Sequence, residues 1–151
     1  MRTTTGTVVC AVLAGAVLAG CSPSSGAATE IDRSTGWVED YPALGEPVSA
    51  AIAVRDQGQE RLPAPDDAYD AVVEVAPETM ATLVDAYPDL APEELNSFTP
   101  AWLLEELPED GVWLRSAALD AHLEEQDGRG VIVNAYLDPE QDRVVLVLME
   151  M

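Results

Sequence analysis

The chain contains no lysine, and it has only one histidine and one phenylalanine. Without lysine it cannot form a Walker-type phosphate loop, a Schiff base with a carbonyl substrate or a Ser-Lys catalytic dyad. The seven basic residues are dispersed arginines, so the chain offers no basic patch to the phosphate backbone of a nucleic acid. The sequence therefore predicts no nucleic-acid partner.

Thiols are equally scarce, because Cys10 and Cys21 are the two cysteines and both lie near the N-terminus. Arg2 provides a small positive region, and an apolar stretch runs from Thr7 to Gly20. A helix of that length is about 21 Å long, which is shorter than the ~30 Å hydrocarbon core of a bilayer. The pattern is typical of an export signal rather than a membrane-spanning helix.

The four residues that end this stretch, Leu18-Ala19-Gly20-Cys21, resemble the lipobox of bacterial lipoproteins. The resemblance implies cleavage between Gly20 and Cys21 and a diacylglyceryl group, carrying acyl chains such as palmitate, on the Cys21 sulfur. Two acyl chains form a stable anchor, whereas one chain holds only marginally. The protein is then expected on the extracytoplasmic face of the cell membrane. The alternative is an ordinary secretory signal in which Cys21 is incidental.

Three segments follow from this interpretation: a signal peptide over 1–20, a lipidated cysteine with a flexible tether over 21–36, and a single acidic domain over 37–151. The tether is rich in Ser, Gly, Ala and Thr and has no periodicity. After cleavage six arginines face 28 carboxylates, a formal charge of −22, and no free thiol remains. A disulfide, a thiol nucleophile and a cysteine metal site are thereby excluded from the mature domain.

Four segments of the domain are predicted to be strands. Residues 48–55 and 69–75 are rich in β-branched or alternating residues, and residues 130–137 and 143–149 form a C-terminal hairpin around the turn 138–142. The last strand is apolar on both faces, so it is expected to be central and covered.

Three short helices are predicted over 77–87, 101–107 and 117–126, because their apolar residues recur at helical spacing. Composition and order together predict an α+β fold: an antiparallel sheet of about four strands with these helices on one face. The order of the strands does not follow from the sequence.

Local signals fix the ends and faces of two of these helices. Ser116 is expected to cap the third helix and Gly128 to end it. In the second helix, Leu103, Leu104 and Leu107 are expected to share the buried side.

The hairpin turn carries the one metal-like pattern, because Asp138, Glu140 and Asp142 alternate like the first ligands of a calcium loop. Arg143 then stands where an EF-hand needs glycine, and Met149 stands where it needs glutamate. Turn chemistry explains the same residues better, so these three acids are weak metal candidates and neither a metal site nor a cofactor is predicted.

Catalytic signals are also weak. His122 is the one histidine, and the sequence has no G-x-S-x-G nucleophile turn that would accompany it as a catalytic base. A structural role at the surface or at the edge of the core is therefore favoured over a catalytic one. Adjacent carboxylates on a helix diverge by about 100°, so they do not converge on a substrate. Adjacent acidic pairs include Asp66-Asp67, Glu105-Glu106, Glu109-Asp110 and Glu124-Glu125. No catalytic residue is predicted.

Acidic residues crowd the C-terminal turns of two predicted helices, where the helix dipole disfavours anions by about 0.3–1 kcal/mol each. They are Glu105, Glu106, Glu124, Glu125 and Asp127. One explanation is a general acidic bias suited to salty surroundings. The other is a surface that meets a basic protein partner or divalent cations.

The three tryptophans allow two interpretations: they line a ligand groove, or they form part of an ordinary hydrophobic core. Trp102 and Trp113 are expected in the core, whereas Trp37 is expected to be exposed near the tether. Beyond the lipobox, the composition is similar to that of small uncharacterised lipoproteins of high-GC Gram-positive bacteria.

These observations favour a non-catalytic binding or interaction module of the cell envelope, held to the membrane by the lipid on Cys21. The alternative function is a carboxylate-dependent envelope hydrolase, which needs only two well-placed acids and a cleft that raises the pKa of one of them.

Overall fold

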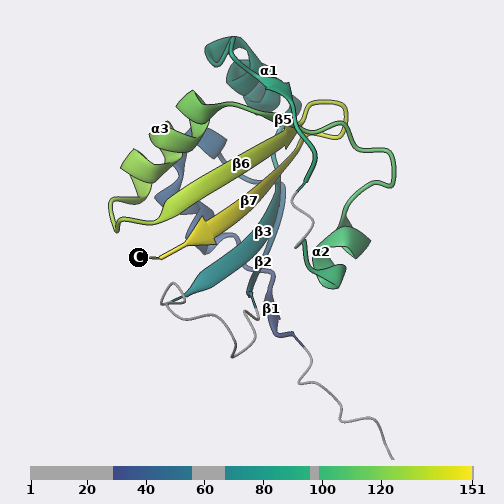
Figure 1. Ribbon diagram of the computed structural model, residues 1–151, viewed down its shortest axis with the longest axis vertical. Helices are drawn as coiled ribbons and strands as arrows, with labels where there is room; N and C mark the ends of the chain where they lie inside the picture. Colours follow the sequence, from purple (N-terminus) through teal and green to yellow (C-terminus); the bar gives the residue numbers. More distant parts are fainter. Residues whose placement is uncertain (1–28, 56–66, 96–98, 151) are drawn as a thin grey trace, which may run out of the picture.

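A seven-stranded antiparallel sheet organises the protein in the computed structural model, which describes residues 29–55, 67–95 and 99–150 (Figure 1). In order across the sheet, the strands are β1 (Ile31–Asp32), β2 (Ser49–Val54), β3 (Ala68–Glu74), β7 (Arg143–Met149), β6 (Ile132–Asp138), β5 (Leu114–Arg115) and β4 (Ala91–Pro92). The helices are α1 (Pro77–Ala86), α2 (Ala101–Glu106) and α3 (Ala117–Asp127), preceded by the 3-10 turns η1 (Gly36–Asp40) and η2 (Pro42–Leu44). The predicted α+β class is confirmed.

The four long strands are those that the sequence predicts, and they lie side by side as β2, β3, β7 and β6. Seven residues of β7 pair with β3 on one side and with β6 on the other. All five residues from Val144 to Leu148 are buried. The prediction of a central, covered last strand is therefore confirmed, and its apolar residues on both faces are explained by burial on both faces.

The prediction of about four strands is wrong, because β1, β5 and β4 extend the sheet to seven. Each of these has two residues, too few to show an alternating pattern in the sequence. Ile31 and Asp32 of β1 pair with Ala53 and Ile52, so the sheet begins inside the segment 21–36 that the sequence assigns to the tether.

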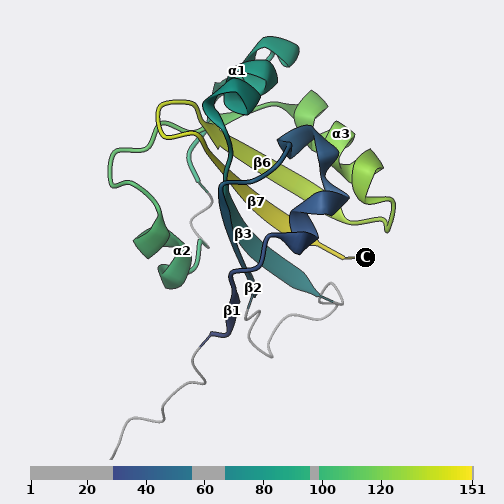
Figure 2. The same ribbon diagram turned by 180° about the vertical axis from the view of Figure 1, so that it is seen from behind.

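One face of the sheet carries the larger core, under α1, α3, η1 and η2 (Figure 2). Met80 and Leu83 from α1 and Leu119 and Leu123 from α3 are buried there. Their i, i+3 and i, i+4 spacings place each pair on one side of its helix, as the sequence predicts.

The other face carries a smaller core under α2, so the prediction that all helices lie on one face is wrong (Figure 1). Leu103 is completely buried against this face, whereas Leu104 is 55% exposed. A helix of six residues with one buried leucine gives too weak a pattern to define its buried side. The expected grouping of Leu104 with Leu103 is thus also wrong.

The ends of α3 are as predicted. The Ser116 hydroxyl accepts a hydrogen bond from the Leu119 amide at 3.2 Å, and Gly128 ends the helix at φ 67°. In α2, by contrast, Pro100 occupies the N-cap position and supplies no side-chain cap.

Acidic side chains of α3 cover the outer edge of β6, which β5 pairs only at Tyr136 and Leu137. The Ala135 amide donates to Asp120 Oδ1 at 2.8 Å, and the Val133 amide donates to Glu124 Oε1 at 3.0 Å. These bonds satisfy edge amides that would otherwise be open to another strand. Two acids of α3 therefore stabilise the sheet.

Asp120→Ala is expected to destabilise the protein by about 1–3 kcal/mol, because it leaves the Ala135 amide buried without an acceptor. Asp120→Asn keeps an oxygen at that position and should cost less. Urea unfolding followed by circular dichroism measures both variants. Equal losses would show that the amide bond contributes little and that the Arg115 ion pair, at 2.8 Å from Asp120, is the dominant contact.

Candidate functional site

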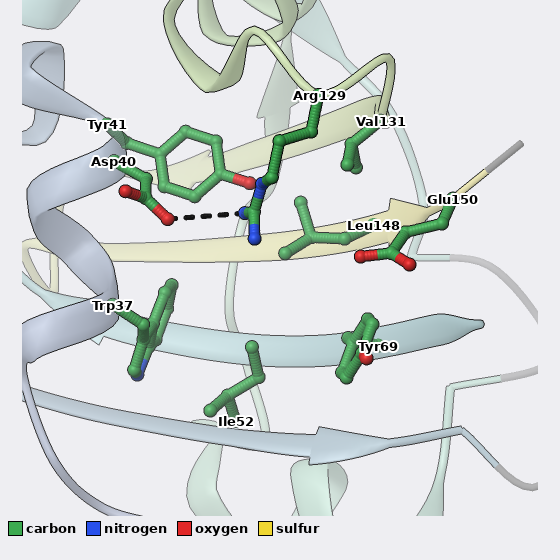
Figure 3. A pocket seen from close by; sticks show the side chains of 9 residues that line it. All are labelled: Trp37, Asp40, Tyr41, Ile52, Tyr69, Arg129, Val131, Leu148 and Glu150. Carbon is green, nitrogen blue, oxygen red and sulfur yellow. Dashed lines mark ion pairs between the residues drawn. The ribbon is translucent and has the colours of Figure 1, made fainter.

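A cavity of about 200 Å³ lies on the larger core's side of the sheet, between η1 and the loop that joins α3 to β6 (Figure 3). Its floor comes from three adjacent strands: Ile52 of β2, Tyr69 of β3 and Leu148 of β7. Tyr69 and Leu148 are direct cross-strand partners, so their side chains lie together on one face. Each of these strands pairs with a neighbour on both sides, and this pairing holds the floor in place.

The 3-10 turn η1 forms one wall of the cavity. With three residues per turn, it places Trp37 and Asp40 on one side and Val38 and Tyr41 on the next. Val38 and Tyr41 are each 1% exposed, which fixes the turn against the core. Trp37 packs against Tyr41 edge to face, with ring centroids 6.5 Å apart. Trp37 is thus half-buried, not exposed as the sequence suggests.

The opposite wall is Val131 together with Arg129, which reaches back to the end of α3 (Figure 3). The positive φ of Gly128 reverses the chain there. Arg129 then donates from Nε and Nη2 to Asp127 at 2.9 and 2.7 Å, and it lies 3.2 Å from the Asp40 carboxylate. The guanidinium is therefore already paired with two carboxylates.

Tyr41 joins Asp40, Asp127 and Arg129 in one cluster, because its hydroxyl donates to Asp127 Oδ2 at 2.7 Å. Burial and the neighbouring Asp127 raise the pKa of the Tyr41 phenol well above its ordinary value. Hydrogen bonds from Arg129 and Tyr41 lower the pKa of the Asp127 carboxyl. At neutral pH the phenol is protonated and the carboxyl ionised, so the cluster holds one positive and two negative charges with Asp40.

Glu150 is the second carboxylate in the cavity lining, after Asp40, and it is directed towards the centre of the cavity (Figure 3). Within the described part of the chain, this carboxylate makes no hydrogen bond or ion pair. Burial raises the pKa of the Tyr69 phenol, and the nearby Asp67 and Glu150 raise it further. Among the described lining residues, the carboxylates of Asp40 and Glu150 outnumber the single arginine, Arg129, so the cavity has aromatic side chains in its lining and a negative net charge.

Asp127 is expected to make the fold sensitive to acid. Its folded pKa lies below the ordinary value of 3.8, so ionised Asp127 stabilises the native state above that pH. This stabilisation is lost as the pH falls through the folded pKa. The difference in Tm between the wild type and Asp127→Asn should be largest near about pH 6 and shrink towards about pH 3. A constant difference would contradict this role.

A second hollow, of about 270 Å³, lies on the α2 side beside β1 and β2. Arg33 donates to Glu106 at 2.6 Å, which lowers the pKa of the Glu106 carboxyl, and Arg143 donates to the Glu106 backbone oxygen. These contacts fasten α2 to the sheet. Two arginines and two glutamates line the hollow, so its described lining has no net charge to favour a charged ligand.

Three of the five acids at the helix ends have intramolecular partners that the sequence does not reveal. Glu124 accepts from β6, Asp127 from Arg129, and Glu106 from Arg33. Burial raises the pKa of the Asp120 carboxyl, but its two oxygens accept from Arg115 and from the Ala135 amide, and it lines neither hollow.

The weak metal candidates lie in the β6–β7 turn. Asp138 is 1% exposed, and its Oδ1 accepts from the amides of Glu140 and Gln141, while Asp142 has a positive φ of 53°. Within residues 29–55, 67–95 and 99–150, no three acidic, histidine or cysteine side chains gather as metal ligands would. Asp138 here shapes the turn.

His122 is exposed on α3, where Nδ1 shares a hydrogen bond with the Tyr87 hydroxyl and Nε2 lies 3.1 Å from the Gln126 amide nitrogen. Trp102 and Trp113 pack in the smaller core. Cys10, Gly20 and Cys21, and with them the predicted cleavage and lipidation, lie outside the described residues.

The cavity residues were not predicted as a site, although one local signal pointed to part of it. The sequence Asp127-Gly128-Arg129 places opposite charges around a helix-ending glycine, a spacing that returns the second residue to the first. Nothing in the sequence connects this turn to Trp37 or Tyr69.

Comparison with known proteins finds no protein-family model, no curated protein and no solved structure that matches this chain. None of the helices in the described ranges has the length and apolar character needed to cross a membrane.

Proposed function

We propose that this protein is a lipid-anchored module on the extracytoplasmic face of the cell membrane that binds another component of the envelope. The lipobox-like residues ending at Cys21 support the anchor, and the cavity between η1 and the α3–β6 loop supports the binding role. Its principal support is the composition of that cavity, which combines an aromatic and aliphatic lining with an excess of carboxylates. A small number of polar groups around an apolar hollow is typical of a ligand site.

A protein partner fits this cavity better than a drug-sized molecule, because a hollow of about 200 Å³ is smaller than the ~300–1,000 Å³ of most small-molecule pockets. It is large enough for one side chain. With a formal charge of −22 after cleavage, the domain attracts basic partners and repels acidic ones. We therefore favour a basic protein partner over divalent cations.

The alternative function, a carboxylate-dependent hydrolase, would use Asp40 and Glu150, the two acids that line the cavity. Asp40 is already paired with Arg129, whereas a general acid must hold a proton near neutral pH. Among the described residues, the carboxyl whose pKa is raised by burial is Asp120, which lies outside the cavity. These placements favour binding over catalysis.

The anchor is tested by growing cells with labelled fatty acid. We expect label on the wild-type protein and none on Cys21→Ala, because the thiol is the attachment atom. Equal label on both proteins would contradict the anchor.

The binding role is tested by chemical cross-linking of the protein in its native membrane, followed by identification of proteins recovered in near-equal amounts. We expect a reproducible basic partner that is lost at high salt, since exposed charges are screened beyond about 8 Å at physiological ionic strength. Recovery of bulk membrane protein alone would contradict the proposal. A rise in Tm with calcium, absent with sodium at matched ionic strength, would favour a cation ligand instead.

A further inference from the structure

The geometry points to a specific occupant: we infer that the cavity lined by Trp37, Tyr69 and Glu150 receives a lysine or arginine side chain of the basic partner. This inference rests on the proposed function, because it names the chemistry of that binding site. Lysine and arginine share the chemistry that the inference requires, which is one cationic group at the end of an alkyl stem.

Different lining residues suit the alkyl stem of the entering side chain and its cationic group. Ile52, Val131 and Leu148 offer aliphatic surface for methylene groups. Trp37 and Tyr69 stand at two sides of the hollow, and aromatic faces attract cations by about 0.5–2 kcal/mol (Figure 3). The site thus provides an apolar path with aromatic rings beside it.

The carboxylates determine the sign of the charge that the cavity prefers. The Arg129 guanidinium is paired with Asp127 through Nε and Nη2 and with Asp40 through Nη2, so its charge is already matched by two carboxylates other than Glu150. Among the described residues, no cation pairs with the Glu150 carboxylate, which is directed into the cavity (Figure 3). An entering ammonium or guanidinium group would provide that missing charge, whereas an anion would face the carboxylates of Asp40 and Glu150.

Several side chains and strands around the cavity are also held in place by contacts within the fold. Tyr41 is 1% exposed and bonded to Asp127, Trp37 packs on Tyr41, and the floor strands are paired on both sides. A preformed site loses little conformational entropy on binding. This favours a single side chain as occupant even though its contact area is small.

The test is an NMR titration of the mature, lipidated protein in micelles of dodecyl maltoside. This detergent is non-ionic, so it does not compete for a cation site. The probes are four pentapeptides, acetyl-Gly-Gly-X-Gly-Gly-amide, in which X is lysine, arginine, norleucine or glutamate. The signal is the indole N–H of Trp37, assigned by its loss in Trp37→Phe, with the indole signals of Trp102 and Trp113 as internal references.

We expect the lysine or arginine peptide to shift the Trp37 signal saturably and the norleucine and glutamate peptides to leave it unchanged. Glu150→Gln should weaken binding about 2- to 5-fold, the range of an exposed ion pair. Glu78→Gln is the matched control, because Glu78 is exposed on α1 and outside the cavity, and it should have no effect.

Three results would overturn the inference: an equal shift with norleucine, which indicates an apolar site; a shift with glutamate, which indicates an anion site at Arg129; or no shift with either cationic peptide. In each case a partner recovered by cross-linking would still support the proposed function, and the cationic chemistry alone would be wrong. A cation-specific titration without any recovered partner would support the site and contradict the protein-binding role.

Discussion

Asp70→Leu is expected to destabilise the protein by about 3–5 kcal/mol, the usual cost of removing one partner from a buried ion pair. The Asp70 side chain is 1% exposed, and the Arg55 side chain is 17% exposed. Arg55 donates from Nε to Asp70 Oδ2 at 2.8 Å and from Nη2 to Oδ1, so both carboxylate oxygens are occupied. The substitution leaves the guanidinium near the sheet without its counter-charge. Urea unfolding of both proteins measures the difference.

The double variant Arg55→Met/Asp70→Leu separates the value of the pair from the cost of breaking it. Replacing both members of a buried pair with apolar residues is often neutral, so most of the lost stability should return. If the double variant is as unstable as Asp70→Leu, the loss comes from the shape of the apolar residue and not from the orphaned charge.

Leu103→Ala is expected to cost about 2–5 kcal/mol, because it removes the residue of α2 that is completely buried in the smaller core. Leu104→Ala, on the same helix, is the matched control. Its side chain is 55% exposed, so the same deletion should cost no more than about 0.5 kcal/mol. Thermal unfolding of the two variants measures the contrast. Similar Tm values would show that α2 is not docked on the sheet in solution.

The ends of α3 and the C-terminal hairpin could be predicted because their signals are local. Ser116 and Gly128 act on the amides and the backbone angle of their own helix, and the apolar residues of β7 reflect burial on both faces. The two-residue strands and the buried side of α2 could not be predicted, since they depend on contacts with distant segments.

The site could not be predicted for the same reason. Trp37, Tyr69, Arg129 and Glu150 come from four separate parts of the chain, and only the order of the strands brings them together. The acids of the helix ends illustrate the difference. By sequence they oppose the helix dipole, but Glu124 bonds to β6 and Asp127 to Arg129, and these contacts offset that cost.

Two groups of acids can therefore be distinguished by their surroundings. Asp70, Asp120 and Asp127 are buried or half-buried and bonded within the fold, where they contribute to stability. Glu150 faces the cavity without a partner among the described residues, and we assign it to binding. Variants of the first kind are expected to change Tm, and variants of the second kind to change affinity.

The central claim, that a partner binds at the cavity, is tested most directly by photo-cross-linking in the native membrane. Benzoylphenylalanine replaces Tyr69 in the cavity floor or, as a control, Thr82, which is exposed on α1. We predict a discrete cross-linked partner from position 69 that is absent from position 82 and weakened by Glu150→Gln. The same products from both positions, or none from position 69, would contradict the claim that the cavity is the binding site.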